Sequence, residues 1–294
     1  MAQPHEREYI LGTHDEEARR LGLQHRLWSD AAHEDWKRAG LRPGMRVLDV
    51  GCGPGFAALD MVQVVTGDPV HHPGGLVVGV DESARYVESL RSNAAARGFG
   101  REVVGIVGDV MDLAGAIASD GAAGGRGVDG AGSFDLAYAR WVLCFVPRPM
   151  DVVRGVAGLL KAGGRWVVHD YFNYESMALA PRCASFERVV KAVGASWRSR
   201  GGDPDVMARV PGMCVEAGLT VEHLSCDERV ARPGDAMWTW PDTFFRIFVP
   251  TLVQHGFLSQ PHADEFTDDW RKWSKMPGAF GHLPPVYRMV ARKA

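Results

Sequence analysis

The chain has 294 residues, of which 46% are hydrophobic and 23% charged, a composition typical of a globular protein with one large core or two small ones. Its formal net charge of −3 provides no basic field for binding nucleic acid. No apolar run approaches the roughly 18–20 residues of a membrane span, and no signal-peptide segment opens the chain. We therefore expect a soluble, cytoplasmic protein with no nucleic-acid or membrane partner.

The cysteine pattern supports the same expectation. Cys52, Cys144, Cys183, Cys214 and Cys226 form an odd, scattered set without a C-x-x-C pair. Such a set favours a reducing compartment and argues against both a disulfide framework and a zinc site. We expect no bound metal.

The first 170 residues alternate between helical and strand patterns. Thr13 and Glu16 have capping-box spacing, which predicts a helix from there to about Arg38. We then expect strands at 47–50, 76–80, 103–107, 134–138 and 165–169, with helices at 56–65, 83–97 and 150–160. This alternation predicts a parallel sheet with helices on both faces. Residues 114–132 are rich in Gly and Ala, and we expect them to form a mobile loop.

The pattern changes after residue 170. Apolar residues at helical spacing predict a helix over 186–197, and Asp203-Pro204 predicts the start of a second helix that runs to Gly218. Residues 221–224 and 286–291 have strand patterns. Between them, 237–281 is a long aromatic stretch with helical segments.

The stretch Val47-Leu48-Asp49-Val50-Gly51-Cys52-Gly53-Pro54-Gly55 is the most informative part of the chain. An apolar strand runs into three glycines at alternate positions, which allow a sharp turn and a close approach of a ligand to backbone N–H groups. A dinucleotide fingerprint would require Gly-x-Gly-x-x-Gly, but Phe56 stands at the position of its last glycine.

Acidic residues follow the next two strands. Asp81 ends Val77-Val78-Gly79-Val80-Asp81, where its carboxylate could accept hydrogen bonds from a ribose diol or cap the next helix. Asp109 follows the third strand in Val107-Gly108-Asp109-Val110. Two further motifs are Phe134-Asp135-Leu136-Ala137-Tyr138-Ala139-Arg140-Trp141 and Leu160-Lys161-Ala162-Gly163-Gly164-Arg165-Trp166-Val167-Val168.

Together, these five motifs resemble those of the class I S-adenosylmethionine (SAM)-dependent methyltransferases. The resemblance implies an α/β fold: a Rossmann-like, doubly wound, seven-stranded, mostly parallel sheet whose last strand is antiparallel, with helical cap insertions. It also implies that SAM is the cofactor. The implied contacts are the methionine half on Gly51, Cys52, Gly53 and Gly55, the ribose on Asp81 and Glu82, the adenine on Asp109 and Val110, and a fourth-strand contact from Arg140.

The resemblance narrows to small-molecule methyltransferases of the ubiquinone/menaquinone methyltransferase-like group, on Tyr9-x-Leu11-Gly12, Arg140-Trp141-Val142-Leu143 and Gly201-Gly202-Asp203-Pro204. It implies that Tyr9 contacts the ligand, although an ordinary packing role is equally open. The expected layout is a single domain over 1–294. It comprises an N-terminal helical lid (1–40), a SAM-binding core (41–170), cap or substrate insertions (171–219 and 228–284) and final strands (220–227 and 285–294).

Transfer to a phenol or enol would also require removal of a proton, and the candidates are His169, Asp170 and Tyr171 at the end of the fifth strand. The alternative for His169 and Asp170 is ordinary packing and capping, and His255 is a weaker candidate. The insertions carry many aromatic residues, which would either line a pocket for a flat hydrophobic acceptor or pack the cap.

The predicted function is SAM-dependent methyl transfer to a small, hydrophobic or aromatic molecule at oxygen, nitrogen or carbon. The motif Asn/Asp-Pro-Pro-aromatic, which the resemblance associates with methylation of DNA bases, is missing after the fourth strand, where the chain has Ala139-Arg140-Trp141-Val142. A non-catalytic SAM-binding protein and an NAD-dependent oxidoreductase are the competing hypotheses. A homodimer stays open.

Overall fold

The computed structural model describes residues 15–67, 74–121, 125, 128 and 130–294. Its main sheet has seven strands in the order β3-β2-β1-β4-β5-β10-β7. Their bounds are β1 Arg46–Val50, β2 Leu76–Asp81, β3 Val103–Val107, β4 Phe134–Arg140, β5 Leu160–Tyr171, β7 Leu219–Asp227 and β10 Val286–Lys293. The strands from β3 to β5 are parallel, while β10 is antiparallel to both of its neighbours. This topology confirms the predicted doubly wound α/β fold with an antiparallel last strand.

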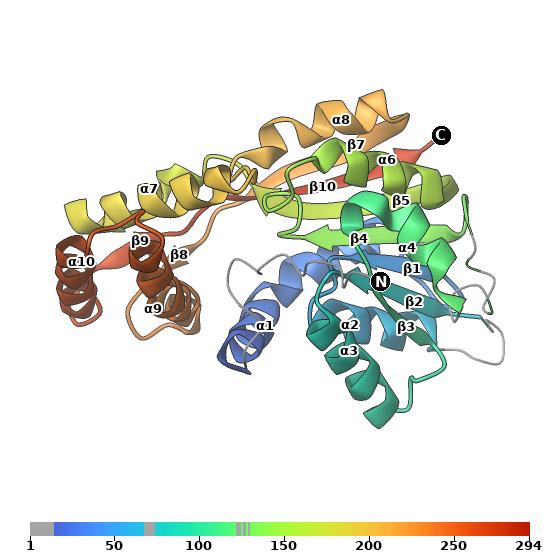
Figure 1. Cartoon of the computed structure of the whole chain (residues 1–294), viewed down its shortest axis with the longest axis horizontal. Helices are drawn as coiled ribbons and strands as arrows, with labels where there is room; N and C mark the ends of the chain where they lie inside the picture. The colour runs from blue at the N-terminus through green and yellow to red at the C-terminus, as the bar shows by residue number, and fades with distance from the viewer. Residues whose placement is uncertain (1–14, 68–73, 122–124, 126–127, 129) are drawn as a thin grey trace, which may run out of the picture.

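Helices cover both faces of the sheet (Figure 1), which is why the parallel strands are apolar along nearly their whole length. One face carries α1 (Asp15–Arg38), α2 (Phe56–Val65) and α3 (Ala84–Ala96), and the other carries α4 (Leu113–Ser119), α6 (Pro149–Leu159) and α8 (Val210–Glu216). The strands and helices predicted between residues 47 and 107 lie where the periodicity placed them.

Three boundaries differ from the sequence prediction. Residues 113–119 form α4 rather than a loop, because the Asp112 side chain caps the helix by accepting the Gly115 N–H at 3.1 Å. The helix expected from residue 203 to 218 is instead a 3-10 turn, Val206–Ala208, followed by α8, which restarts with Pro211 in its first turn. Strand β5 begins at Leu160, so Gly163 lies within the strand, where the register with β4 shifts.

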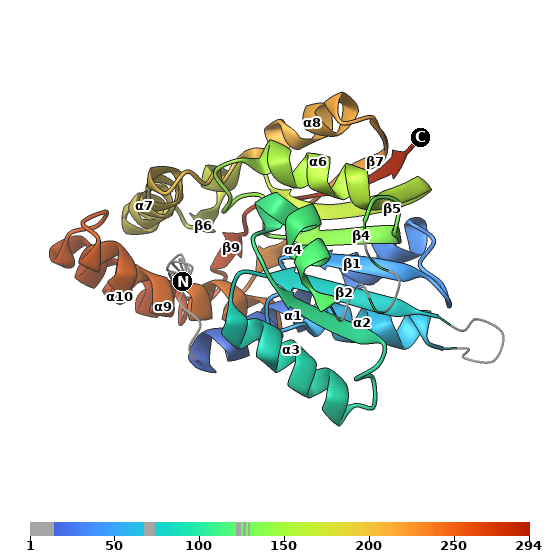
Figure 2. The ribbon, with the colours of Figure 1, turned by 45° about the vertical axis from the view of Figure 1, so that its right-hand side comes forward.

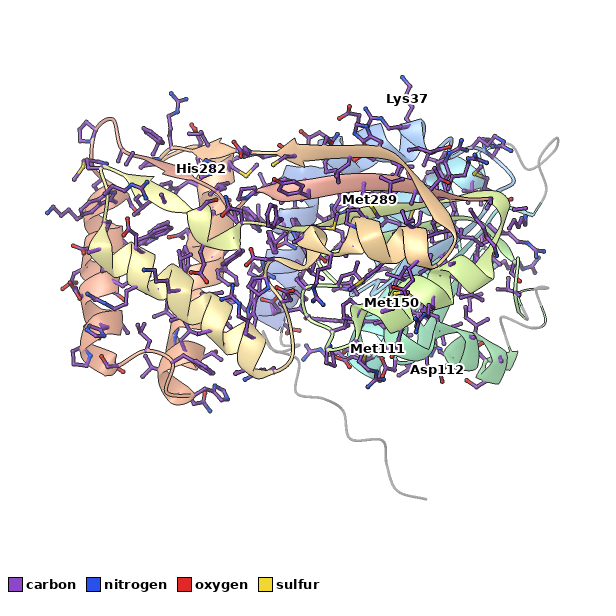
Figure 3. The ribbon with its side chains drawn as sticks, turned by 90° about the horizontal axis from the view of Figure 1, so that it is seen from above. Lys37, Met111, Asp112, Met150, His282 and Met289 are labelled. Carbon is purple, nitrogen blue, oxygen red and sulfur yellow. The ribbon has the colours of Figure 1, made fainter. Side chains whose placement is uncertain are left out.

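The cap extends from one end of the main sheet (Figures 1 and 2). It contains α7 (Ala184–Ser199), α9 (Thr239–Gln254) and α10 (Gln260–Trp273), and short 3-10 turns lie at Tyr174–Ser176 and Ala236–Trp238. A small antiparallel sheet in the order β6-β9-β8, formed by Ala178–Ala180, Phe280–His282 and Val230–Ala231, joins its segments. The sequence patterns did not indicate this sheet. In Figure 3, His282 marks the cap, and Met150 and Met111 lie over the main sheet.

Helix α1 connects the sheet to the cap. At its C-terminal end, the Asp35 carboxylate lies 2.9 Å from His169 Nε2 on β5 and 3.0 Å from Arg288 Nε on β10. In its N-terminal half, Gln24 Oε1 accepts the Trp240 Nε1–H of α9 at 2.8 Å. The helix therefore has a fixed position beside the carboxyl ends of the central strands. No helix in the described residues has the length and apolar character needed to cross a membrane.

Candidate active site

A cavity of about 720 Å³ lies at the carboxyl ends of β1, β2 and β4, where the strand order reverses. Open α/β sheets bind their ligands at such a position. The cavity continues from the glycine loop after β1, beneath α1, to the aromatic side chains of α7 and α9. One continuous space therefore joins the sheet to the cap.

The three glycines of the loop have different roles. All three have positive φ values, of 65° at Gly51, 52° at Gly53 and 88° at Gly55. A Cβ atom at Gly51 would lie 2.5 Å from Val142, and one at Gly55 would lie 2.3 Å from Leu90, so these two positions need glycine for packing. A Cβ at Gly53 would meet nothing within 4 Å, and Gly53 lines the cavity. Gly55 does not line it, so the structure explains this glycine by its packing on α3.

Asp81 fixes the loop from the end of β2. Its Oδ2 accepts the Gly53 N–H at 2.8 Å, and its Oδ1 accepts the Ser83 N–H at 2.9 Å. Burial raises the pKa of Asp81, although the same two hydrogen bonds oppose the rise. Glu82 lines the cavity next to it. A carboxylate pair therefore faces the space beside the glycine loop.

Asp109 and Val110 line the cavity beyond β3. The Asp109 Oδ1 accepts the Met111 N–H at 2.8 Å and so caps the 3-10 turn Val110–Asp112. Cys52 also lines the cavity, and burial raises the pKa of its thiol, so this thiol stays protonated. Tyr9 lies outside the described residues.

Several residues that line the cavity have a buried polar atom with no hydrogen-bond partner within the described part of the chain. Two of these atoms belong to charged side chains, Oδ2 of Asp49 and Nη1 of Arg140; the others are the Tyr138 hydroxyl and the indole N–H groups of Trp141 and Trp197. Burial raises the pKa of Asp49 to about 7; the charge of Arg140 opposes this rise and that of Asp81 adds to it. Buried polar groups normally find partners, so Asp49 and Arg140 are candidates to bind polar or charged groups of a ligand.

Arg140 is held by two residues, His25 and Asp60, that no local sequence pattern indicates. Its Nη2–H donates to Nδ1 of His25 at 2.8 Å, and Nε2 of His25 lies 2.8 Å from Oδ2 of Asp60. Because a guanidinium can only donate, Nδ1 must be the accepting nitrogen and Nε2 carries the hydrogen. Burial lowers the pKa of His25, so the ring stays neutral, as this arrangement requires.

Of the three candidate catalytic residues, only Tyr171 lines the cavity. His169 is 1% exposed, and its ring faces Asp35. The Asp170 carboxylate accepts the backbone N–H groups of Val142 and Cys144, both at 3.2 Å, and of Tyr171 at 2.9 Å. Neither His169 nor Asp170 reaches the cavity, so we assign both as structural residues.

Aromatic rings form the cap side of the cavity. Trp141 has a φ of 53° and stacks on Tyr171 at 6.0 Å and on Trp240 at 5.7 Å between ring centroids. Tyr171 also stacks on Trp197 at 6.0 Å. The other aromatic residues of the insertions divide between the cavity (Tyr174 and Phe244) and packing within the cap or on its surface (Phe172, Trp238, Phe245, Phe248, Trp270 and Trp273).

Three cationic or titratable residues also border the aromatic part: Arg20, which lies 6.0 Å from the Phe244 ring centroid, Arg200 and His255. The Nδ1–H of His255 donates to the Thr251 carbonyl at 2.9 Å, which leaves Nε2 as an acceptor. Within the described residues, no cluster of three or more His, Cys, Asp or Glu side chains could hold a metal ion.

Comparison with known families identifies the family of this domain. The profile of the methyltransferase domain family matches residues 41–199, which include the glycine loop, Asp81, Asp109 and Arg140. The chain belongs to the methyltransferase domain family. The methyltransferase domain thus covers the sheet from β1 to β5 and extends through α7 of the cap.

Individual methyltransferases are similar over part of the chain. The sterol 24-C-methyltransferase of Yarrowia lipolytica is 27% identical over 165 residues, 54% of this chain and 38% of its own length. A ubiquinone biosynthesis O-methyltransferase of Bordetella avium is 29% identical over 185 residues, 58% of this chain and 66% of its own length. The match therefore spans from over a third to about two thirds of these relatives.

A solved structure shows the same fold over most of the chain. The geranyl diphosphate C-methyltransferase of Streptomyces coelicolor, crystallised with S-adenosyl-L-homocysteine, has a TM-score of 0.53 at 16% identity, and the match covers 92% of this chain and 77% of that one. At this identity the likeness concerns the fold alone.

Proposed function

We propose that this methyltransferase domain transfers a methyl group from SAM to a small apolar or aromatic molecule. The observation that carries the proposal is the single cavity that joins the glycine loop of the sheet to the aromatic side of the cap. A cofactor on the sheet side and a flat acceptor on the cap side would meet inside one space. Family membership and the names of the relatives support the methyl transfer, and the aromatic lining supports the acceptor class.

The polar residues of the sheet side match the groups of SAM. Gly53 leaves room for the ligand against the backbone, and Asp81 with Glu82 offers acceptors for a ribose diol. The unpartnered Arg140 Nη1 would pair with the methionine carboxylate. The unpartnered Asp49 Oδ2 would pair with a positive charge of the ligand.

The adenine would lie over the turn that Asp109 caps, beside Val110. Helix α1 contributes Arg20, Gln24 and His25 to the cavity wall, which supports a covering role for the N-terminal segment. In this proposal the sheet side would provide a partner for each end of the cofactor.

When bound, SAM would supply a methyl group on a sulfonium; the acceptor would bond to that methyl carbon in line with the C–S bond, and S-adenosyl-L-homocysteine would be the leaving group. The chain must hold the nucleophile on that line and keep water out. Trp141, Tyr171 and Trp240 form stacked walls that would orient a flat acceptor. Burial raises the pKa of Tyr171 far above neutrality, so its phenol could donate a hydrogen bond to the acceptor but would not remove a proton. We therefore assign Tyr171 a positioning role.

Two measurements on the full chain test the proposal. Calorimetric titration should show that SAM and S-adenosyl-L-homocysteine bind while NAD does not. Incubation with SAM and a panel of phenols, enols and aromatic amines should then yield S-adenosyl-L-homocysteine in proportion to methylated product. Binding of SAM with no turnover on any acceptor would favour a non-catalytic SAM-binding protein, and binding of NAD in place of SAM would overturn the proposal.

A further inference from the structure

Arg200 is a cation on the wall of the aromatic part of the cavity, where the other arginine, Arg20, is paired with Glu17 and Gln24. Within the part of the chain that the structure describes, the Arg200 guanidinium forms no hydrogen bond or ion pair. Its neighbour Arg198 shows the contrast, since that side chain pairs with Glu175 at 2.7 Å and with Asp205 at 3.0 Å and does not line the cavity. The chain thus neutralises one arginine of this turn and leaves the other available to a ligand.

The turn that carries Arg200 has a fixed position. The Gly202 N–H donates to the Trp197 carbonyl at 3.0 Å, and the Asp203 N–H donates to the Cys144 carbonyl at 2.9 Å. Gly201 has a φ of 86°, and a Cβ there would lie 2.8 Å from Pro147. This close packing on the segment after β4 sets the place of Arg200 relative to Trp141, so the guanidinium is not on a freely moving loop.

Arg200 lies away from the expected point of methyl transfer. Trp141 follows β4 directly, Tyr171 stacks on it at 6.0 Å, and Trp197 stacks on Tyr171 at a further 6.0 Å. Arg200 comes one helical turn after Trp197, at the end of α7. A molecule that reached from the transfer point to Arg200 would therefore extend across this row of rings.

Charge is also divided between the two sides of the cavity. The carboxylates Asp49, Asp81, Glu82 and Asp109 all line the sheet side, where the cationic SAM would bind. On the cap side, no carboxylate among the described residues lines the cavity, and Arg200 is left without a counter-charge. A guanidinium pairs most strongly with carboxylate or phosphate, since both accept two parallel hydrogen bonds.

We propose that the methyl acceptor is a flat apolar molecule bearing an anionic group, carboxylate or phosphate, which Arg200 binds while the reacting end lies against the cavity-facing sides of Trp141 and Tyr171. This inference rests on the proposed function, because it names the substrate class of the same site. It assigns Arg200 as the residue that selects anionic over neutral acceptors.

The test measures binding with three matched probes: 2-naphthoate, 2-naphthyl phosphate and the neutral 2-naphthamide. Each is titrated by calorimetry into the full chain saturated with S-adenosyl-L-homocysteine. We expect at least one anion to bind about tenfold more tightly than the amide, the scale of one charge-assisted contact. Preference for the phosphate alone or the carboxylate alone would identify the anion type.

Variants then assign the preference to its residue. Arg200→Gln should reduce the preference to within about twofold, and Arg200→Lys should retain part of it. Arg198→Gln, the matched control two residues away, should leave it unchanged. Equal binding of anions and amide, no binding of either anion, or a preference that survives Arg200→Gln would overturn the inference. If the unmodified chain does not bind S-adenosyl-L-homocysteine at all, that result would instead count against the proposed function.

Discussion

Nδ1 of His25 accepts a hydrogen bond from Arg140 across 2.8 Å, and this contact joins helix α1 to the end of β4 at the floor of the cavity. Asp60 on α2 holds the other ring nitrogen at 2.8 Å, so the ring cannot turn away. The Arg140 side chain is thus fixed with Nη1 left without a partner in the described chain. Three elements cooperate to hold one cationic group where the proposed SAM carboxylate would lie.

Replacing His25 with Ala should therefore weaken SAM binding about tenfold, because Arg140 loses the partner that orients it. Calorimetric titration with SAM measures the change. His33→Ala is the matched control, since His33 is exposed and lies 3.5 Å from the same Asp60 carboxylate without contacting Arg140. Equal effects of the two substitutions would show that the His25–Arg140 contact does not act in binding.

Asp81→Ala should weaken SAM binding by at least about tenfold, for two reasons. The variant loses the ribose acceptor that we propose, and the Gly53 N–H loses the carboxylate that holds it. The loss is measured by calorimetry, with near-ultraviolet circular dichroism to verify folding. Glu88→Ala on the exposed side of α3 serves as the control. Unchanged affinity in Asp81→Ala would remove the ribose assignment.

The sheet side of the site was predictable because its signals are local. An apolar strand followed by Gly51 and Gly53 defines its own turn, and Asp81 follows its strand directly. Parallel strands bring their carboxyl ends to one edge, so the sequence order alone places these groups together. What the pattern could not distinguish is a glycine that faces a ligand from one, such as Gly55, that faces a leucine of α3.

Contacts between segments that are distant in the sequence could not be predicted from local residue patterns. His25 and Asp60 are 35 residues apart on different helices, and nothing in either local pattern pairs them. The small sheet of the cap joins strands of two or three residues, too short for a period to be visible. Position at a strand end likewise does not reveal which neighbour binds a side chain, as with His169 beside Asp35 and Asp170 on the backbone N–H of Val142.

Asp170→Ala tests the structural assignment of that carboxylate. The substitution leaves the backbone N–H groups of Val142, Cys144 and Tyr171 without their acceptor, so the free energy of unfolding should fall by about 3 kcal/mol. Urea denaturation measures this value. Glu216→Ala, which removes an exposed ion pair with Arg154, should change it by less than about 1 kcal/mol. A stable Asp170→Ala variant that has lost only turnover would restore the catalytic hypothesis.

The raised pKa of Asp49, about 7, makes two pH-dependent effects measurable. The first concerns stability. Because the folded-state pKa lies above the unfolded value, the folded chain keeps a proton that the unfolded chain has already released between about pH 4 and 7. The free energy of unfolding contributed by Asp49 therefore falls as pH rises through this window. Asp49→Asn should not show that decline, so its stability relative to the parent chain should increase from pH 5 to pH 8 in urea titrations.

The second effect concerns the ligand. A cationic ligand beside Asp49 favours the ionised carboxylate, so SAM should bind more tightly as pH rises through 7. Below the pKa of Asp49, the affinity for SAM should fall by up to about tenfold for each pH unit. S-adenosyl-L-homocysteine keeps the α-ammonium but lacks the sulfonium charge, so it should show a weaker dependence if Asp49 faces the sulfonium and the same dependence if Asp49 faces the ammonium. Asp49→Asn should make the SAM curve flatter between pH 6 and 8. If the parent chain and the variant gave parallel curves, a group other than Asp49 would control the pH dependence, and the orphan carboxylate would need another partner.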